Sequence, residues 1–267
     1  MDPQSAPSQE TSTNKLSLPI AIVVAGALIA GAIYLSKGNT AVAPTLTNDQ
    51  PAIAITIAPV TPDDHFIGNP EAPITLIEFS DLECPYCKTF HATMKTLMDE
   101  FGKNGKLAWV YRHFPLVQLH PKAVRESFAV ECVNELSNKT ATWNFINKLF
   151  EITPSNNQLE EAALLSTAEA LGVNKTALLA CMDSEKYKEK IDRQINEAIA
   201  AGGRGTPHSA LILREEVTEE TEQILKQKAA LLGAADIVQV GPTRKLVTLS
   251  GALPIDFLRD VINTLVK

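Results

Sequence analysis

The pattern of apolar and polar residues predicts a strand, a helix and a second strand at the start of the folded part of the chain. Residues 74–80 (ITLIEFS) form a mostly apolar run of strand length that contains one carboxylate. Apolar residues then recur at helical spacing from Phe90 to Phe101, and Gly102 stands where a C-terminal cap is expected. Residues 107–114 (LAWVYRHF) follow a short Lys- and Gly-containing turn and are predicted to form the second strand.

A long helical region and a second group of elements follow. Residues 120–201 show helical spacing throughout, which predicts a helical subdomain inserted over about 116–201. After Gly202 and Gly203 the pattern predicts a strand at 209–213, a helix near 219–232, a strand at 246–250 and a helix at 254–266. This order of strands and helices is that of an α/β fold.

The first 62 residues differ in character from the rest. Residues 1–15 are polar, residues 16–35 (LSLPIAIVVAGALIAGAIYL) carry no charge, and residues 36–62 are rich in Pro, Thr and Ala. As a helix, the uncharged run would rise about 30 Å, the thickness of a hydrocarbon core. We therefore expect a polar tail, a transmembrane anchor and a linker before a domain at 63–267. A cleaved signal peptide is the alternative, because Ala41-Val42-Ala43 offers small residues at a cleavage-like spacing.

Charge and cysteine content narrow the functional classes. The net charge of −7 argues against a nucleic-acid-binding surface, which usually shows a concentrated basic patch. Four cysteines are present, two in the sequence Cys84-Pro85-Tyr86-Cys87 and two apart from it, Cys132 and Cys181. This usage is typical of a compartment where disulfides persist, so we expect the C-terminal part to lie outside the cytoplasm.

The C-x-x-C pair is compatible with redox chemistry, half of a metal site or a static crosslink. A zinc site would need a second pair of ligands, and Cys132 and Cys181 stand alone, so neither a metal nor another cofactor is expected. At a helix start, unpaired N–H groups and the helix dipole stabilise a thiolate, which makes Cys84 the predicted nucleophile. Pro85 suits the first helical turn, and Cys87 would resolve the mixed disulfide.

Two carboxylates near this pair affect the prediction. Glu83 is adjacent to Cys84 and would raise the pKa of its thiol by repulsion, whereas Lys88 would lower it. Glu78 lies inside the apolar strand, where a carboxylate needs a partner or a proton. Glu78 is predicted either to relay protons to Cys87 or to pair with a lysine or water at the strand edge. The direction of electron flow stays open at this point.

Four segments of the chain together resemble the DsbA-like thioredoxin family of bacterial envelopes: APITLIEFSDLECPYC, YRHFPL, HPKA and GTPHSALIL. The resemblance covers about residues 63–267 and implies a thioredoxin-like fold with an inserted helical subdomain. It implies that Thr206 and Pro207 form the family's cis-proline loop, which holds substrate backbone beside the cysteines. It also implies that Pro85 and Tyr86 tune the reduction potential.

The resemblance further implies a second disulfide, between Cys132 and Cys181, with two buried free thiols as the alternative. His208 is expected to cap a strand on a solvent-facing edge, with a place in the lining of the substrate groove as the alternative. The chain departs from the family over about 214–244, where a short turn would be usual. We expect the helix in this extra segment to cover a sheet edge, or to contact a partner.

The activity implied by the resemblance is thiol:disulfide exchange that introduces disulfides into reduced client proteins in the periplasm or cell envelope. A quinone-linked membrane protein similar to DsbB or vitamin K epoxide reductase would reoxidise the cysteine pair, and residues 16–35 would hold both in one membrane. A reductase or isomerase of the same fold is the first alternative. A tethered binding module or chaperone with static disulfides is the second.

Overall fold

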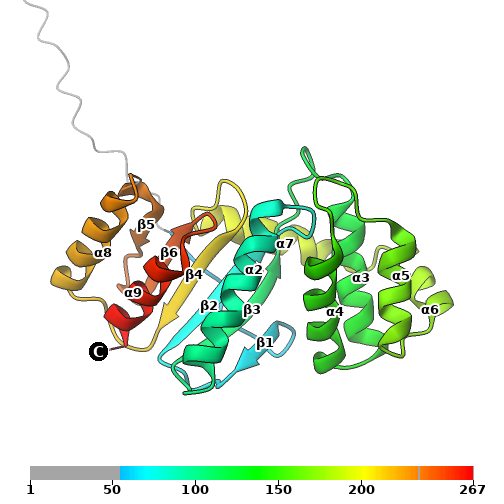
Figure 1. Cartoon of the computed structure of the whole chain (residues 1–267), viewed down its shortest axis with the longest axis horizontal. Coiled ribbons are helices and arrows are strands. Elements are labelled where there is room, and N and C mark those ends of the chain that lie inside the picture. Colours follow the sequence, from blue (N-terminus) through cyan, green and yellow to red (C-terminus); the bar gives the residue numbers. More distant parts are fainter. Residues whose placement is uncertain (1–54, 234, 267) are drawn as a thin grey trace, which may run out of the picture. The chain divides into compact units, whose positions relative to one another are not determined.

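The strands pair into one mixed sheet in the order β1-β3-β2-β4-β6-β5 (Figure 1). The computed structural model describes residues 55–233 and 235–266, which belong to a single compact unit of the chain, Ile53–Lys267. β2 and β3 run parallel, and the other neighbouring pairs are antiparallel. The strand bounds are β1 (His65–Gly68), β2 (Ile74–Ser80), β3 (Leu107–His113), β4 (His208–Leu213), β5 (Val238–Val240) and β6 (Leu246–Ser250).

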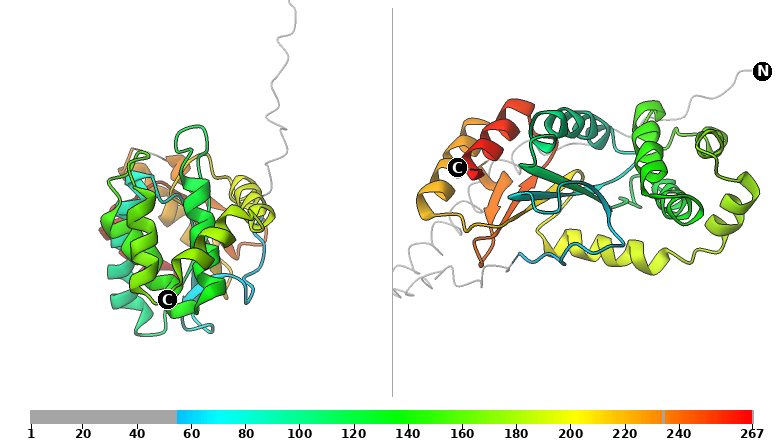
Figure 2. Two further views of the ribbon diagram at one scale, coloured as in Figure 1. Left: turned by 90° about the vertical axis from the view of Figure 1, so that its right-hand side faces the viewer. Right: turned by 90° about the horizontal axis from the view of Figure 1, so that it is seen from below.

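The helices fall into three groups by position (Figures 1 and 2). One face of the sheet is covered by α2 (Pro85–Leu97), which continues into the π-helical turn η1 (Met98–Gly102), and by α8 (Glu219–Leu231) and α9 (Ile255–Leu265). The opposite face is covered by α7 (Lys188–Ala200). The helical insertion consists of α3 (Ala123–Leu136), α4 (Lys139–Ile152), α5 (Glu161–Ala170) and α6 (Lys175–Asp183). A short 3₁₀ turn, η2 (Ala235–Ile237), precedes β5.

Alternation along β2 directs its side chains into two cores. Ile77 and Phe79 join a smaller core against α7, together with Ile55. Leu76 faces the larger core, which also contains Cys87 and the buried side of α2. Because successive side chains of a strand point to opposite faces, Glu78 and Ser80 lie on the same side as Leu76, beneath the cysteine helix.

The predicted α/β fold with a helical insertion is confirmed, and β2 and β6 have the predicted bounds. The end of the first helix is a correction. Gly102 does not cap α2, because the chain continues there as the π-helical turn, and the left-handed residue is Gly105, with φ 71°. A Cβ at Gly102 would come within 2.5 Å of the terminal methyl group of Met98, so a larger residue there would require this flexible side chain to move. The edge strands β1 and β5 were not predicted because three or four residues are too few to show a period.

Residues that precede Asp63 already pack against the domain, although the linker was expected to extend to residue 62. Ile55 is buried, and the N–H of Thr56 donates to the carbonyl of Ala200 at 3.2 Å. The Arg112 guanidinium donates to the carbonyls of Ala58 and Pro59. The predicted tail at 1–15, the anchor at 16–35 and most of the linker lie outside the described residues. Within the part that is described, no helix has both the length and the hydropathy required to span a membrane.

The extra segment at about 214–244 enlarges the sheet and its helical cover. β5 pairs with β6 at the edge of the sheet, and α8 packs against α9 and β5 (Figure 1). Leu225 and Ala229 form the buried side of α8. The helix was predicted to extend to residue 232, but Leu232 lies just beyond its end and is 43% exposed.

Candidate active site

Cys84 and Cys87 lie at the start of α2, in the turn that follows β2. Cys84 occupies the N-cap position with extended backbone angles (φ −81°, ψ 122°), and Pro85 begins the helix. Both cysteines are thiols in this structure and both are buried, whereas Tyr86 between them is 67% exposed. The position predicted from the sequence, a cysteine at a helix N-terminus, is the one that the structure shows.

The two thiols differ in their ionisation. The pKa of Cys84 is lowered to about 6, and the main cause is a hydrogen bond from Cys87. Burial raises this pKa. Contacts with Thr206 and with the N–H groups of Cys87 and Tyr86 lower it further. For Cys87, burial and the neighbouring Cys84 raise the pKa well above its ordinary value. The pair is therefore arranged to carry a thiolate at Cys84 and a thiol at Cys87.

The Thr206–Pro207 peptide bond is cis and lies opposite the cysteine pair. The carbonyl oxygen of Thr206 is 3.5 Å from Cys84 Sγ. His208 does not lie at a solvent-facing edge, because it is only 1% exposed. Its ring packs on Phe79, and its Nε2 is 3.0 Å from the Ala201 carbonyl. β4 is an inner strand of the sheet, so its first residue is covered by α7 and by the neighbouring strands.

Glu78 is fully buried beneath the cysteines and has two hydrogen-bond donors. The Ser80 hydroxyl donates to Oε1 at 2.7 Å, and the Trp109 indole N–H donates to Oε2 at 3.0 Å. Burial raises the pKa of Glu78 to about 7, and these two hydrogen bonds limit the rise. The predicted alternative, in which Glu78 pairs with a lysine or water at the strand edge, is therefore wrong. Ser80 also moderates the raised pKa of Cys87, so its hydroxyl lies near both the carboxyl group and the buried thiol.

Asp81 organises the turn before the cysteines, although the sequence pattern did not single it out. Its backbone N–H is 3.4 Å from Cys87 Sγ, and its Oδ1 accepts from the N–H of Glu83. Oδ2 accepts from the N–H of Leu116 and lies 2.9 Å from His120 Nδ1. An Asp after a strand often binds backbone N–H groups of the next turn, which is the signal that could have identified it.

Glu83 is directed away from the cysteine sulfur, contrary to the predicted repulsion. Its two carboxylate oxygens accept from the N–H groups of Asn157 (2.7 Å) and Leu159 (3.0 Å), in the loop between α4 and α5. Lys88 likewise turns to this loop and donates to the Thr153 carbonyl. Neither side chain is among the main causes of the lowered pKa of Cys84. Partners distant in sequence, which adjacency cannot reveal, decide where both charges lie.

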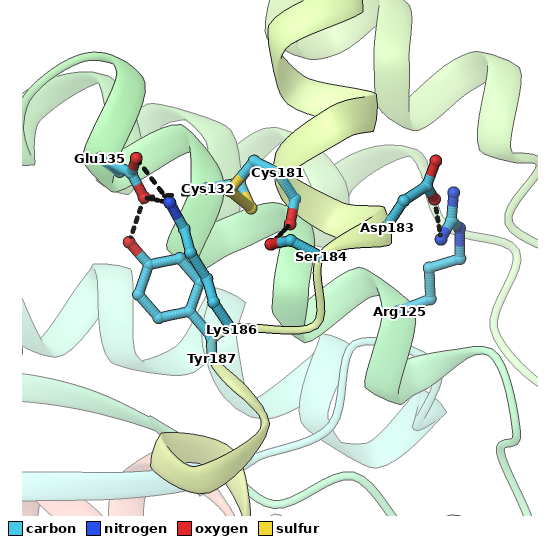
Figure 3. The surroundings of a disulfide bond; sticks show 8 residues. All are labelled: Arg125, Cys132, Glu135, Cys181, Asp183, Ser184, Lys186 and Tyr187. Carbon is cyan, nitrogen blue, oxygen red and sulfur yellow. Dashed lines mark hydrogen bonds and ion pairs between the residues drawn. A yellow bond between two sulfur atoms is a disulfide. The ribbon is translucent and has the colours of Figure 1, made fainter.

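The expected second disulfide is present between Cys132 on α3 and Cys181 on α6, with the two Cα atoms 5.9 Å apart (Figure 3). Cys132 is fully buried and Cys181 is 9% exposed. Beside the bond, Glu135 accepts hydrogen bonds from Lys186 and Tyr187, as Figure 3 shows. Cys181 Sγ lies 3.9 Å from Glu135 Oε2. This disulfide closes the insertion and lies apart from the C-x-x-C pair.

Among the described residues, His65, His113 and Glu131 form a group whose ligand atoms lie within 4.8 Å of one another. Glu131 Oε1 is 2.9 Å from His65 Nε2 and 3.1 Å from His113 Nε2. The Lys190 ammonium is 2.7 Å from Oε2, so a positive charge already pairs with this carboxylate. Burial would raise the pKa of Glu131, but hydrogen bonds from both histidines hold it well below its usual range. The group is a hydrogen-bonded junction of β1, β3, α3 and α7.

Comparison with known proteins bears on both the fold and the family. The thioredoxin family model matches residues 60–231, more than half of the chain. BdbD from Bacillus subtilis has a similar structure, with a TM-score of 0.60 and 17% identity over 80% of this chain and 98% of that one. α-DsbA1 from Wolbachia pipientis gives a TM-score of 0.58 and 21% identity over 77% of this chain and 92% of that one.

A curated relative named Na⁺/H⁺ antiporter NhaA 1, from Salinispora arenicola, is 30% identical over 152 residues. The match covers 57% of this chain and 22% of the relative, so the chain spans about a fifth of the relative's length. The family assignment rests on the matching family model, and the similarity to solved structures supports the fold. The chain belongs to the thioredoxin family, and its fold is that of the DsbA-like thiol–disulfide oxidoreductases.

Proposed function

We propose that this protein is a dithiol oxidase that introduces disulfides into reduced client proteins through Cys84 and Cys87. The observation that carries the proposal is the unequal ionisation of the pair, with the pKa of Cys84 lowered to about 6 and that of Cys87 raised. A low-pKa thiol is a good leaving group, and a stabilised thiolate favours the reduced form. Both effects make the corresponding disulfide an oxidant.

The proposed reaction has two exchange steps. A client thiolate attacks the Cys84 sulfur of the oxidised pair, so the Cys84–Cys87 bond breaks, a client–Cys84 bond forms and the electron pair passes to Cys87. A second client thiolate then attacks the client sulfur, which forms the client disulfide and releases Cys84 as a thiolate. The client loses two electrons, the cysteine pair gains them, and Cys87 takes up one proton.

Glu78 is the group that we assign to this proton. The Ser80 hydroxyl donates to its carboxyl group and also affects the pKa of the Cys87 thiol, so Ser80 is the proposed route for the proton. With a pKa of about 7, Glu78 can hold or release a proton near neutral pH. Thr206 and Pro207 would hold the client backbone, because the Thr206 carbonyl faces Cys84. Pro85 and Tyr86 would set the potential of the pair.

The location and the electron acceptor belong to the same proposal. The domain would work in the periplasm or cell envelope, held at the membrane by residues 16–35, and a quinone-linked membrane protein of the DsbB or vitamin K epoxide reductase type would reoxidise it. The antiporter named among the relatives is compatible with a thioredoxin-like part that works beside a membrane. A reductase or isomerase would use the same cysteines with a lower potential.

The test uses the purified protein and a reduced client peptide that contains two cysteines. Wild type should oxidise the peptide, Cys84→Ser should not, and Cys87→Ser should accumulate a peptide–Cys84 mixed disulfide. The equilibrium with glutathione then gives the reduction potential of the pair, which determines the direction of electron flow. A potential of about −120 mV supports an oxidase, and one of about −270 mV supports a reductase. Absence of both peptide oxidation and a trapped intermediate would leave the binding module as the function.

A further inference from the structure

The loop that contains the cis peptide bond is closed by the side chain that follows it. His208 is the first residue of β4, and its Nε2 atom lies 3.0 Å from the carbonyl oxygen of Ala201, at the end of α7. A carbonyl oxygen can only accept a hydrogen bond, so Nε2 is the nitrogen that carries the proton. The imidazole therefore joins the two ends of residues 201–208, the stretch that includes Thr206 and Pro207.

The other ring nitrogen of His208 has a partner that fits the same proton position. Nδ1 lies 3.2 Å from the Ser250 hydroxyl, which can donate to it when the ring is neutral. Burial lowers the pKa of His208, so the ring carries a single proton at neutral pH. The ring also stacks on Phe79, with the two ring centroids 6.3 Å apart. One tautomer, with its hydrogen on Nε2, therefore gives both nitrogens a partner.

The acceptor at the end of α7 is itself held in place. Ala201 is fully buried, and its N–H donates to the carbonyl of Glu197 at 2.8 Å. The preceding carbonyl, that of Ala200, accepts from the N–H of Thr56 at 3.2 Å, next to the buried side chain of Ile55. The hydrogen bond from the imidazole therefore ends on a fixed point of the domain.

The loop also packs closely on the His208 ring. The N–H of Gly203 donates to the carbonyl of Ala198 at 2.8 Å. A Cβ at Gly203 would lie 2.8 Å from that carbonyl oxygen and 3.2 Å from His208 Cγ, so the close approach requires a glycine. At the other end, the Pro207 carbonyl accepts from the N–H of Gly251 at 2.9 Å. The loop is thus held at both ends and lies against the ring between them.

We propose that His208 is a positioning residue for the client: its hydrogen bond to Ala201 fixes the loop that holds the client backbone beside Cys84. This inference rests on the proposed function and deepens it. The Thr206 carbonyl lies 3.5 Å from Cys84 Sγ, so a displaced loop would change the distance between a bound client and the reacting sulfur. The His208 ring packs with Phe79 in the core beside α7, whereas the cysteines belong to the other core, so His208 acts through the loop.

The hydrogen bond should matter for thiols that are carried on a peptide. A client peptide places its backbone along the loop while its thiolate approaches Cys84, and this orientation contributes to the rate. Dithiothreitol is a small dithiol without a peptide backbone for the loop to hold. Loss of the His208 hydrogen bond should therefore slow the reaction with the peptide selectively, whereas damage to the cysteine pair would slow both reactions.

The experiment compares the second-order rate constants with which the oxidised full chain reacts with the reduced client peptide and with dithiothreitol. His208→Phe keeps a ring against Phe79 but removes the hydrogen bond. It should slow the reaction with the peptide about tenfold, the factor that corresponds to an unsatisfied buried carbonyl, and leave the reaction with dithiothreitol unchanged. His208→Gln places an amide donor near the position of Nε2 and should restore the rate with the peptide.

His91 on α2 provides a matched control. It is also a buried histidine that stacks on a phenylalanine, Phe150, and its Nε2 lies 2.7 Å from Asn147 Oδ1. His91→Phe therefore removes one hydrogen bond from a stacked ring without touching the loop at 201–208. The ratio of its two rate constants should equal that of wild type.

Nitrogen NMR of the wild-type chain adds a test that needs no variant, and it should show the His208 proton on Nε2 at neutral pH. The inference is overturned if Nδ1 carries this proton or if His208→Phe leaves the rate with the peptide unchanged. It is also overturned if His208→Phe slows both reactions equally, if His208→Gln is as slow as His208→Phe, or if His91→Phe lowers the ratio as much. Failure of the proposed function would look different, because wild type itself would then not oxidise the peptide.

Discussion

The indole N–H of Trp109 donates a 3.0 Å hydrogen bond to Glu78 Oε2 between the neighbouring parallel strands β3 and β2. The other oxygen of Glu78 accepts from Ser80, so both carboxyl oxygens are held while the group has no access to solvent. A carboxyl group fixed in this way can exchange a proton only through its hydrogen-bond partners, and Ser80 is the partner that also affects the pKa of Cys87.

Glu78 should make the stability of the reduced protein depend on pH. Its pKa rises from 4.5 to about 7 on folding, so between these values the folded state binds a proton that the unfolded state does not. The stabilising proton is fully present below about pH 4.5 and is lost as the pH rises through about 7. The contribution of Glu78 to the free energy of unfolding should therefore fall by about 3 kcal/mol over this range, while His91, whose pKa is lowered to about 4, contributes in the opposite sense. Glu78→Gln should remove this fall, as measured by urea denaturation at a series of pH values.

Glu189→Gln provides the control for this measurement, because Glu189 is an exposed glutamate on α7. It should retain the full pH dependence of wild type. If Glu78→Gln and Glu189→Gln gave the same pH profile, Glu78 would not be the buried titrating group.

The reduced protein should be reactive toward alkylating reagents well below the pH at which ordinary cysteines react. The pKa of Cys84 is lowered from 9.0 to about 6, so its alkylation by iodoacetamide should show a midpoint near pH 6. Mass spectrometry of the modified peptide assigns the site. In Cys84→Ala, the remaining Cys87 should react slowly up to alkaline pH, since burial raises its pKa. A wild-type midpoint near pH 9 would contradict the ionisation on which the proposed oxidase rests.

Removal of the Cys132–Cys181 disulfide should destabilise the domain. The bond joins residues 49 positions apart, and closing a loop of that length restricts the unfolded chain by an entropy worth about 4 kcal/mol. Cys132→Ala combined with Cys181→Ala should lower the free energy of unfolding by that order. Denaturant titrations in a Cys84→Ala/Cys87→Ala background isolate the effect of this one bond. An unchanged denaturation midpoint would show that the bond has no stabilising role.

Arg112→Met should cost about 3–5 kcal/mol, because it leaves a buried carboxylate without its partner. The Arg112 guanidinium pairs with Asp64 at 2.8 Å and with Glu197 at 3.1 Å, and Arg112 is only 2% exposed. Arg193→Met is the matched control, since Arg193 lies 4.0 Å from the same Glu197 but is 62% exposed. Chemical denaturation should show a large loss for Arg112→Met and almost none for Arg193→Met. Equal losses would mean that the burial of the pair does not matter.

The sequence predicted those features that depend on local order. A buried strand, a C-x-x-C pair and a helix follow one another directly, so the position of Cys84 at a helix start could be read from the sequence alone. The strand at Leu246–Ser250 and the helical insertion were also predicted, because periodic burial leaves a local pattern. The Cys132–Cys181 bond was inferred only from family resemblance, since spacing does not determine a pairing.

The surroundings of the cysteine pair were decided by the tertiary structure. Glu83 was expected to repel the thiol beside it, yet its carboxylate binds Asn157, 74 residues later in the chain. Trp109 reaches the site from β3, and its position carries no local signal of that role. The sequence by itself determined which atoms can do chemistry, because reactivity begins with side-chain type and helix placement. Only the tertiary structure decided which charges and protons surround them, because those contacts depend on how distant segments pack together.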